Sequence, residues 1–166
     1  MTVTFTETYN NMVDRGSWTS GPWSGELDKA VWVHNGVDCM IKRNALGAWC
    51  GYVGVKKGHH LFGVEYYDVN TGDTTINGEL TYSAECHEEI CHLADEGDHV
   101  WWLGFDCCHS FNFYPGDTIM NSMWRGYSHE SLSRYVTQEQ VVEMVNQMAN
   151  DVNKWTKWEG ESEDDD

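Results

Sequence analysis

Hydrophobic and polar residues alternate along the first half of the chain in the pattern typical of β-strands. The segment KAVWVH alternates, and Asn35-Gly36 after it supplies the two positive-φ positions that a type I′ turn requires. The sequence therefore predicts a hairpin over residues 29–43. A third strand over Ala48–Val55, after the Leu46-Gly47 turn, extends it into an antiparallel meander.

Two further strands are predicted after the Gly-rich segment 56–78. One covers Glu79–Ser83. The other, Val100–Phe105, is a short apolar run between turn signals, which is typical of a buried central strand.

The clearest helix signal follows Thr137. Thr137 and Gln140 form a capping box, in which each side chain accepts a backbone N–H that the helix leaves without a partner. The apolar residues after it share one helical face and are interpreted as core: Val141, Val145, Met148, Val152 and Trp155. A shorter helix is predicted over Ser128–Tyr135. The predicted fold class is α+β, with an antiparallel sheet (meander plus central strand) packed against a C-terminal amphipathic helix.

The 166 residues suit one domain. Residues 1–28 are polar and Gly-rich, and they predict an irregular arm anchored by Trp18 and Trp23. Residues 29–158 form the α+β domain. Residues 159–166 form a disordered acidic tail.

The formal charge of −17 changes the picture of possible partners. A body of that sign repels nucleic acid and anionic membranes and attracts a basic protein surface, although solubility alone also accounts for it. No apolar run approaches the ~20 residues of a membrane span, and the first residues lack the pattern of a signal peptide. We therefore expect a cytoplasmic protein without a membrane partner, whose six cysteines are reduced thiols or metal ligands.

Cysteine and histidine concentrate between residues 86 and 109. These thiols and imidazoles suit zinc, and the candidate ligands are Cys86, Cys91, His92, Cys107 and His109. The spacing argues only weakly for a metal, because Cys86 and Cys91 are far apart for a finger knuckle. Buried thiols and hydrogen-bonded histidines are the alternative. A calcium loop starting at Asp68 is disfavoured, because Asp73 stands where that loop needs glycine.

A candidate catalytic site follows from the two strand ends. The Val100–Phe105 run changes abruptly to ionisable residues, and the Gly58-His59 turn ends the Ala48–Val55 strand, so both place polar groups at a rim of the sheet. The predicted site contains His59, Glu79, Asp106, Cys107 and His109 at one end of the sheet. The alternative is that Asp106 caps a turn and His109 bonds a backbone carbonyl.

Several strings occur in a characteristic order: GPWSGELDKAVW, CGYVGVKKGHHLFG, NGELTYS, ICH and VWWLGFDCCH. With them the chain resembles, over about residues 21–150, a family of uncharacterised bacteriophage and actinobacterial proteins. That family carries the motifs CGYVGVPxGHP, HGGLTYS and WWxGFDCAH. The resemblance implies a phage context and no particular activity.

The chain departs from the family pattern at four positions. Asn77 and Glu79 replace the His and second Gly of HGGLTYS, His60 replaces the Pro after Gly-His, and Asn112 replaces an Asp. If the replaced residues act in catalysis in the relatives, this chain has lost that activity or uses Glu79 and His60 instead.

Three functions remain open from the sequence. The first is a small acidic protein that binds and inhibits a host factor as a counter-defence, with carboxylates standing in for the phosphates of nucleic acid. The second is a small hydrolase or nucleotide-handling enzyme, and the third is a structural domain stabilised by zinc. Charge mimicry needs carboxylates in a stripe on one face, whereas an enzyme needs a pocket where His and acids converge.

Overall fold

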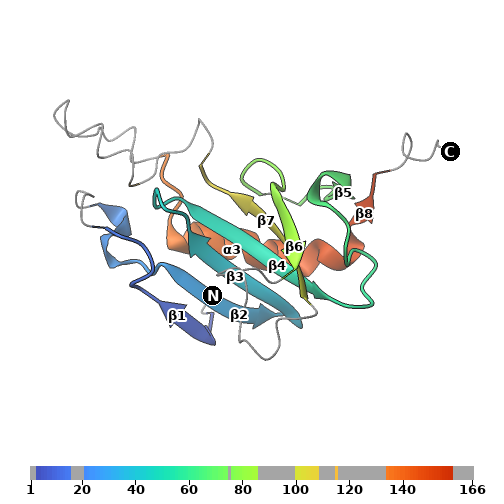
Figure 1. The fold of residues 1–166 in the computed structure, drawn as a ribbon, viewed down its shortest axis with the longest axis horizontal. Coiled ribbons are helices and arrows are strands. Elements are labelled where there is room, and N and C mark those ends of the chain that lie inside the picture. Colours follow the sequence, from blue (N-terminus) through green and yellow to red (C-terminus); the bar gives the residue numbers. More distant parts are fainter. Residues whose placement is uncertain are drawn as a thin grey trace.

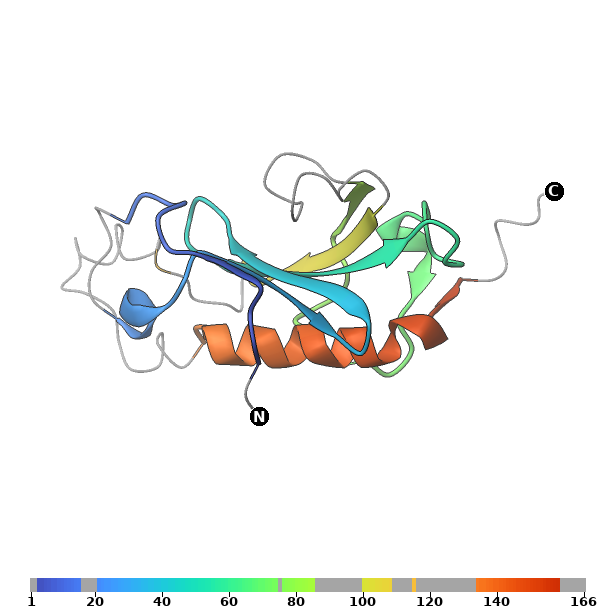
Figure 2. The ribbon, with the colours of Figure 1, turned by 90° about the horizontal axis from the view of Figure 1, so that it is seen from below.

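The computed structural model describes residues 3–15, 21–74, 76–85, 100–108, 115 and 134–158. Within these ranges a six-stranded antiparallel sheet forms one layer, and the helix α3 (Gln138–Asp151) lies across one of its faces (Figure 1, Figure 2). The α+β class predicted from the sequence is confirmed. No helix in the described part of the chain is long and apolar enough to cross a membrane.

The sheet is a meander with one strand inserted out of order. Its strands run β1-β2-β3-β4-β7-β6, and every neighbouring pair is antiparallel. Their bounds are β1 Glu7–Tyr9, β2 Lys29–His34, β3 Val37–Arg43, β4 Trp49–Lys56, β6 Tyr82–Glu85 and β7 Val100–Asp106. Because β7 lies between β4 and β6, the apolar run predicted as a central strand is indeed interior.

The predicted meander is confirmed in detail. Asn35 and Gly36 have φ values of 54° and 77°, as a type I′ turn requires. The strand predicted at Glu79–Ser83 starts later, at Tyr82, because Gly78 has a φ of 89° and turns the chain just before it.

The N-terminal arm is not irregular throughout, which corrects the prediction. Its residues Glu7–Tyr9 form the edge strand β1, paired with β2. The alternation in TVTFTETY is the signal that reveals this strand. Trp23 anchors the arm as predicted and is 1% exposed, whereas Trp18 lies outside the described residues.

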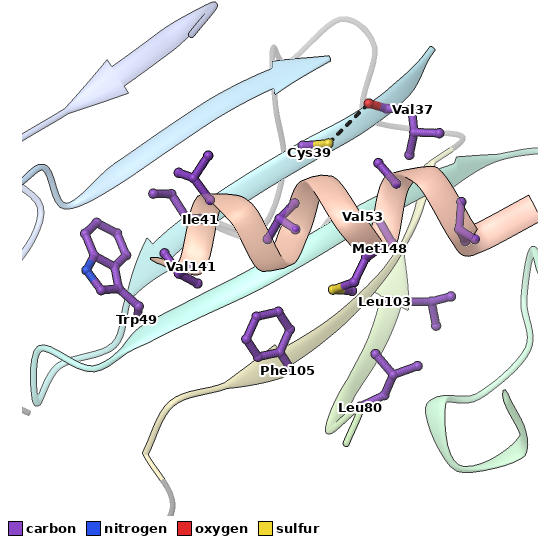
Figure 3. Close-up of a cluster of buried hydrophobic side chains, with 14 of the residues drawn as sticks. Val37, Cys39, Ile41, Trp49, Val53, Leu80, Leu103, Phe105, Val141 and Met148 are labelled. Atoms are coloured by element: carbon purple, nitrogen blue, oxygen red, sulfur yellow. Dashed lines mark hydrogen bonds between the residues drawn. The ribbon is translucent and has the colours of Figure 1, made fainter. Parts of the chain in front are cut away.

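The main core lies between the sheet and α3 (Figure 3). The helix begins with the predicted capping box: the Thr137 hydroxyl accepts the Gln140 N–H at 3.1 Å, and the Gln140 side chain accepts the Thr137 N–H at 2.9 Å. Val141, Val145 and Met148 are fully buried against the strands. The α-helix ends at Asp151, so Val152 and Trp155 lie beyond it, although both remain buried.

Close contact between α3 and the sheet depends on Gly51 in β4. A Cβ at this position would lie 2.6 Å from the Phe105 ring and 2.6 Å from Val145, which is too close for either group. The glycine of the CGYVGV string therefore sets how near the helix can approach.

The sheet face away from α3 carries a second buried cluster, as the alternation of side chains on strands requires. Its members are Val31, Met40, Cys50, Tyr52, Val100 and Trp102, with Tyr82 packed against them.

A short two-stranded ribbon lies beyond the C-terminal end of α3 (Figure 1). It pairs β5 (Val69–Asn70) with β8 (Thr156–Lys157) and was not predicted. Trp155, next to β8, is buried and donates its indole N–H to the Thr74 hydroxyl at 2.8 Å. The ribbon is therefore fixed to the domain. Most of the predicted helix Ser128–Tyr135 and the whole tail 159–166 lie outside the described residues.

Candidate functional site

Three of the strings that carry the family resemblance meet on the face of the sheet opposite α3. Gly104 of β7 pairs with Tyr52 of β4 on one side and with Tyr82 of β6 on the other. The two tyrosine rings meet edge to face, with centroids 5.4 Å apart, above the glycine. The Thr81 hydroxyl donates to the Asp106 carboxylate at 3.0 Å. The three sequence segments therefore pack together where β4, β7 and β6 lie side by side, and we call this contact of Tyr52, Gly104, Tyr82, Thr81 and Asp106 the joint.

The Cys50 thiol and the Tyr52 hydroxyl of this joint are held in their neutral forms. Cys50 lies opposite Asp106 in the register, and burial, with the nearby Asp106 carboxylate adding to it, raises the pKa of the Cys50 thiol to about 12. Burial also raises the pKa of Tyr52. A thiol in this state is a poor nucleophile, because the thiolate is the reactive form.

Asp106 caps the turn that ends β7. Its carboxylate accepts the Cys108 N–H at 3.0 Å as well as the Thr81 hydroxyl, and its backbone carbonyl accepts the Asn77 amide at 3.3 Å. This arrangement matches the turn-capping alternative. Glu79 lies between Asn77 and Thr81 in the sequence, so its segment reaches the end of the sheet that carries Asp106, as predicted. The side chain of Glu79 is exposed.

His59 does not join Asp106 and Cys107, and the prediction that they share one end of the sheet is wrong. Lys56, just before the His59 turn, pairs with Val100, whereas Cys50 pairs with Asp106. Because the strands are antiparallel, six residues, or roughly 20 Å, separate the two ends. The His59 Nε2 instead lies 2.8 Å from the Asn153 side chain, and its Nδ1 accepts the Leu61 N–H at 3.1 Å.

Cys107 is buried in the core on the α3 side, and its N–H donates to the Trp49 carbonyl at 2.8 Å. Burial raises the pKa of its thiol, which favours the neutral form over the reactive thiolate. The other zinc candidates, Cys86, Cys91, His92 and His109, lie outside the described residues. Among the described residues no three His, Cys, Asp or Glu side chains are grouped closely enough to hold a metal ion.

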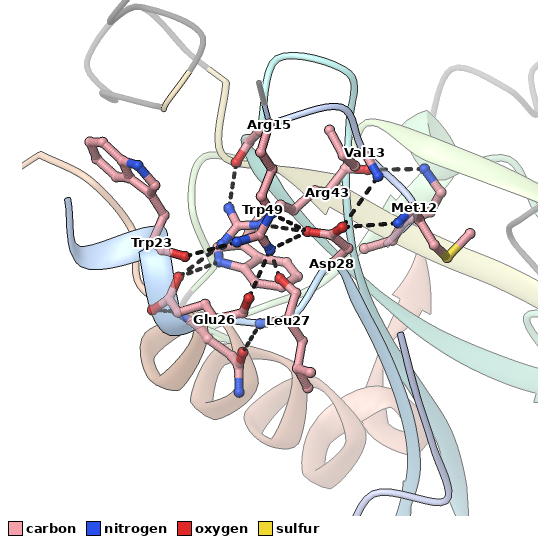
Figure 4. Close-up of polar contacts among 12 residues, drawn as sticks. Met12, Val13, Arg15, Trp23, Glu26, Leu27, Asp28, Arg43 and Trp49 are labelled. Atoms are coloured by element: carbon pink, nitrogen blue, oxygen red, sulfur yellow. Dashed lines mark hydrogen bonds and ion pairs between the residues drawn. The ribbon is translucent and has the colours of Figure 1, made fainter. Parts of the chain in front are cut away.

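A cluster of charged side chains that the sequence did not reveal joins the arm, the sheet and α3 (Figure 4). At its centre Arg43 is completely buried and its guanidinium lies 4.1 Å from the centroid of the Trp49 ring. It donates to Glu26 Oε1 at 3.1 Å and to the Gly47 carbonyl at 2.7 Å, and its Nε lies 3.4 Å from Asp28 Oδ1.

Asp28, also completely buried, ties the arm to this cluster. Its carboxylate accepts the backbone N–H groups of Met12 at 3.0 Å and Val13 at 3.2 Å. It also forms an ion pair with Arg15. The N-terminal arm is thus fixed to the sheet by the Asp28 carboxylate as well as by the buried Trp23 ring.

Glu26 connects the cluster to the start of α3. One carboxylate oxygen accepts the Gln138 N–H at 2.8 Å, a favourable position for negative charge at a helix N-terminus. The other accepts the Trp49 indole N–H at 3.2 Å and the Tyr135 hydroxyl at 2.5 Å. Burial raises the pKa of Tyr135, which keeps that hydroxyl a donor. The carboxylates and guanidinium groups are all partnered, so this cluster is a structural connection.

Two adjoining hollows lie along α3. A hollow of about 840 Å³ follows the helix, and a second of about 410 Å³ continues it to the β5–β8 ribbon. Both are lined by Asp73 and Gln147, so they form one groove, which we call the α3 groove. Its other acidic lining residues are Glu139 and Glu143 in the first hollow and Asp151 in the second.

The carboxylates on α3 follow a regular spacing. Every fourth residue from position 139 to position 151 is acidic except one: the series is Glu139, Glu143, Gln147 and Asp151. Residues spaced in this way follow one side of a helix at steps of about 6 Å. Arg134 and His34 line the first hollow and Lys154 lines the second, so the groove is acidic with scattered basic groups.

Comparison of the chain with protein-family models, with curated proteins and with solved structures gave no match. The resemblance to the bacteriophage and actinobacterial family therefore stays a prediction.

Proposed function

We propose that this chain is a binding protein that engages a basic surface of a host protein through the α3 groove. The observation that carries the proposal is the row of carboxylates along α3 beside an open groove. Such a row supports charge mimicry, which needs carboxylates in a stripe on one face. Of the residues expected to form a catalytic site, His59 lies at the other end of the sheet from Asp106, and the Cys107 thiol is buried with a raised pKa.

The charge of the whole chain supports the same partner. At a net charge of −17, long-range attraction speeds encounter with a basic surface and slows encounter with nucleic acid. Within this proposal the partner is a nucleic-acid-binding host factor, and the protein acts as a counter-defence inhibitor by occupying the surface that binds phosphates.

The test removes groove charges without changing shape. A Glu139→Gln/Glu143→Gln variant keeps two exposed, helix-compatible side chains and loses two carboxylates. The matched control, Glu79→Gln/Glu85→Gln, loses the same charge from exposed residues that line neither hollow. Type II restriction endonucleases and bacterial repressors serve as probes, and calorimetry measures the dissociation constant with each.

We expect at least one probe to bind the wild-type protein and to be displaced from it by duplex DNA. The groove variant should bind that probe roughly 5- to 30-fold more weakly, at about 0.5–1 kcal/mol for each exposed charge pair. The control variant should bind within twofold of wild type. Equal losses in the two variants, or no binding to any basic probe, would refute the groove.

A further inference from the structure

The β5–β8 ribbon at the end of the α3 groove presents an exposed acid opposite an exposed indole. Val69 pairs with Lys157, and the next residues along continue the ladder, because the Trp158 N–H donates to the Asp68 carbonyl at 2.9 Å. Asp68 and Trp158 are therefore opposite each other. Asp68 is the last residue of the short 3-10 helix Tyr66–Asp68 and Trp158 follows β8, so the two residues meet through their backbones where the ribbon ends.

Both side chains are open to solvent. Trp158 is 58% exposed and the adjacent Tyr67 is 63% exposed, the two highest values among the large hydrophobic side chains of the described residues. Asp68 is exposed as well, and it makes no ion pair within 4.0 Å with any other described residue. Tryptophan, tyrosine and arginine are the residues enriched at the energetic centres of protein interfaces, so this place suits a partner.

The ribbon is held rigidly, so little order has to be gained on binding. Val69 and Trp155 are buried in the main core, and the His60 ring donates to the Trp155 carbonyl at 2.7 Å. The Tyr67 ring meets the Tyr66 ring edge to face, with centroids 5.1 Å apart.

We propose that Asp68 and Trp158, which we call the ribbon pair, bind an arginine side chain of the partner protein. The guanidinium would stack on the indole and bond to the carboxylate, since arginine combines cation–π stacking with recognition of carboxylates. Charge complementarity selects this ligand, because the pair supplies the exposed Asp68 carboxylate and the whole chain carries a net charge of −17. By strand alternation Lys157 points to the other face.

The ribbon pair deepens the proposed function, on which it rests, because it lies where the α3 groove ends. Asn70 and Thr156 pair with each other in the ribbon and line the second hollow. The ribbon pair is two residues farther along, or roughly 7 Å. A basic segment that lies in the groove can thus place one arginine on the ribbon pair.

The experiment uses the full chain and an eight-residue peptide of alternating Arg and Ser. The same peptide with citrulline in place of arginine keeps the shape and loses the charge. Dissociation constants are measured for wild type, Asp68→Asn, Trp158→Leu and the groove variant Glu139→Gln/Glu143→Gln. Glu85→Gln and Leu46→Ala are matched controls, because each alters an exposed acid or an exposed apolar residue elsewhere. The indole N–H signal of Trp158, assigned with Trp158→Phe, is followed by NMR.

We expect Asp68→Asn and Trp158→Leu each to weaken binding of the arginine peptide about two- to fivefold. The Trp158 signal should shift with the arginine peptide and stay in place with the citrulline peptide, while the buried Trp23 signal stays in place with both. Wild-type affinity in both ribbon variants, or equal binding of the two peptides, would overturn the ribbon pair.

The groove variant separates this inference from the proposed function. If it weakens binding while both ribbon variants bind as wild type, the ribbon pair is wrong and the groove stands. If the ribbon variants weaken binding and the groove variant does not, the ribbon pair stands and the groove is wrong.

Discussion

Replacing Arg43 with methionine tests the buried charged cluster most directly. Methionine keeps much of the side-chain volume and removes the guanidinium, which is completely buried. The substitution removes three interactions of the guanidinium nitrogens: the hydrogen bond to Glu26 Oε1 at 3.1 Å, the ion pair with Asp28 Oδ1 at 3.4 Å and the hydrogen bond to the Gly47 carbonyl oxygen at 2.7 Å. Asp28 keeps Arg15, so Glu26 is the less compensated carboxylate.

Removing one partner of a buried ion pair costs about 3–5 kcal/mol, because the remaining charge stays buried without compensation. For a chain of 166 residues this corresponds to a drop in melting temperature of roughly 6–20 °C. Adding Glu26→Gln to Arg43→Met should recover part of the loss, since it neutralises the carboxylate that Arg43 leaves behind.

Urea denaturation, followed by tryptophan fluorescence and by circular dichroism, gives the free energy of unfolding of each variant. Arg134→Met is the control, because Arg134 is an exposed arginine, and it should change stability by less than about 0.5 kcal/mol. An Arg43→Met protein within 1 kcal/mol of wild type would refute the view that this cluster holds the arm, the sheet and α3 together.

One further prediction concerns the joint between β4, β6 and β7, and another concerns buried thiols. Gly104→Ala should lower the free energy of unfolding, measured by urea denaturation, by about 1–3 kcal/mol, because the new Cβ would overlap the Tyr52 ring and lie 2.9 Å from the Gly51 carbonyl oxygen. Gly25→Ala is the control, because a Cβ there would have nothing within 4 Å. Equal stability of the two variants would contradict the packing. Stability should also fall as pH rises above about 9, because burial raises the pKa of Cys39 and Cys50 to about 12 and the unfolded chain then loses protons that the folded chain keeps. A melting temperature that stays constant from pH 8 to 11 would contradict it.

The strands and the helix were predictable because each carries its signal locally. Asn35-Gly36 specifies a turn by its backbone conformation, and Thr137 with Gln140 caps α3 through bonds to their own neighbours. β1 also has a local signal in its alternating residues, but the surrounding polar composition hides it. The ribbon strands β5 and β8 are two residues each and have no such pattern.

The candidate site was harder to predict because it depends on strand order. Placing His59 beside Asp106 requires both residues at the same rim, yet β4 and β7 run antiparallel and end at opposite rims. The buried cluster has the same difficulty, since Glu26 and Tyr135 are 109 positions apart and meet only when α3 docks. The carboxylate row of α3 was visible as residues four apart, but the groove beside it depends on where loop 70–74 lies.

The order of the elements along the chain has a consequence during synthesis on the ribosome. α3 is the cover of the main core, and it follows every strand of the six-stranded sheet. At 5–20 residues per second, roughly 2–8 s pass between the translation of Phe105 and that of Val145, whose side chains both lie against Gly51. During that time α3 has not yet covered the apolar face of the nascent sheet. We therefore expect the nascent chain to need chaperone protection in this interval, and a chain stopped before Gln138 to aggregate.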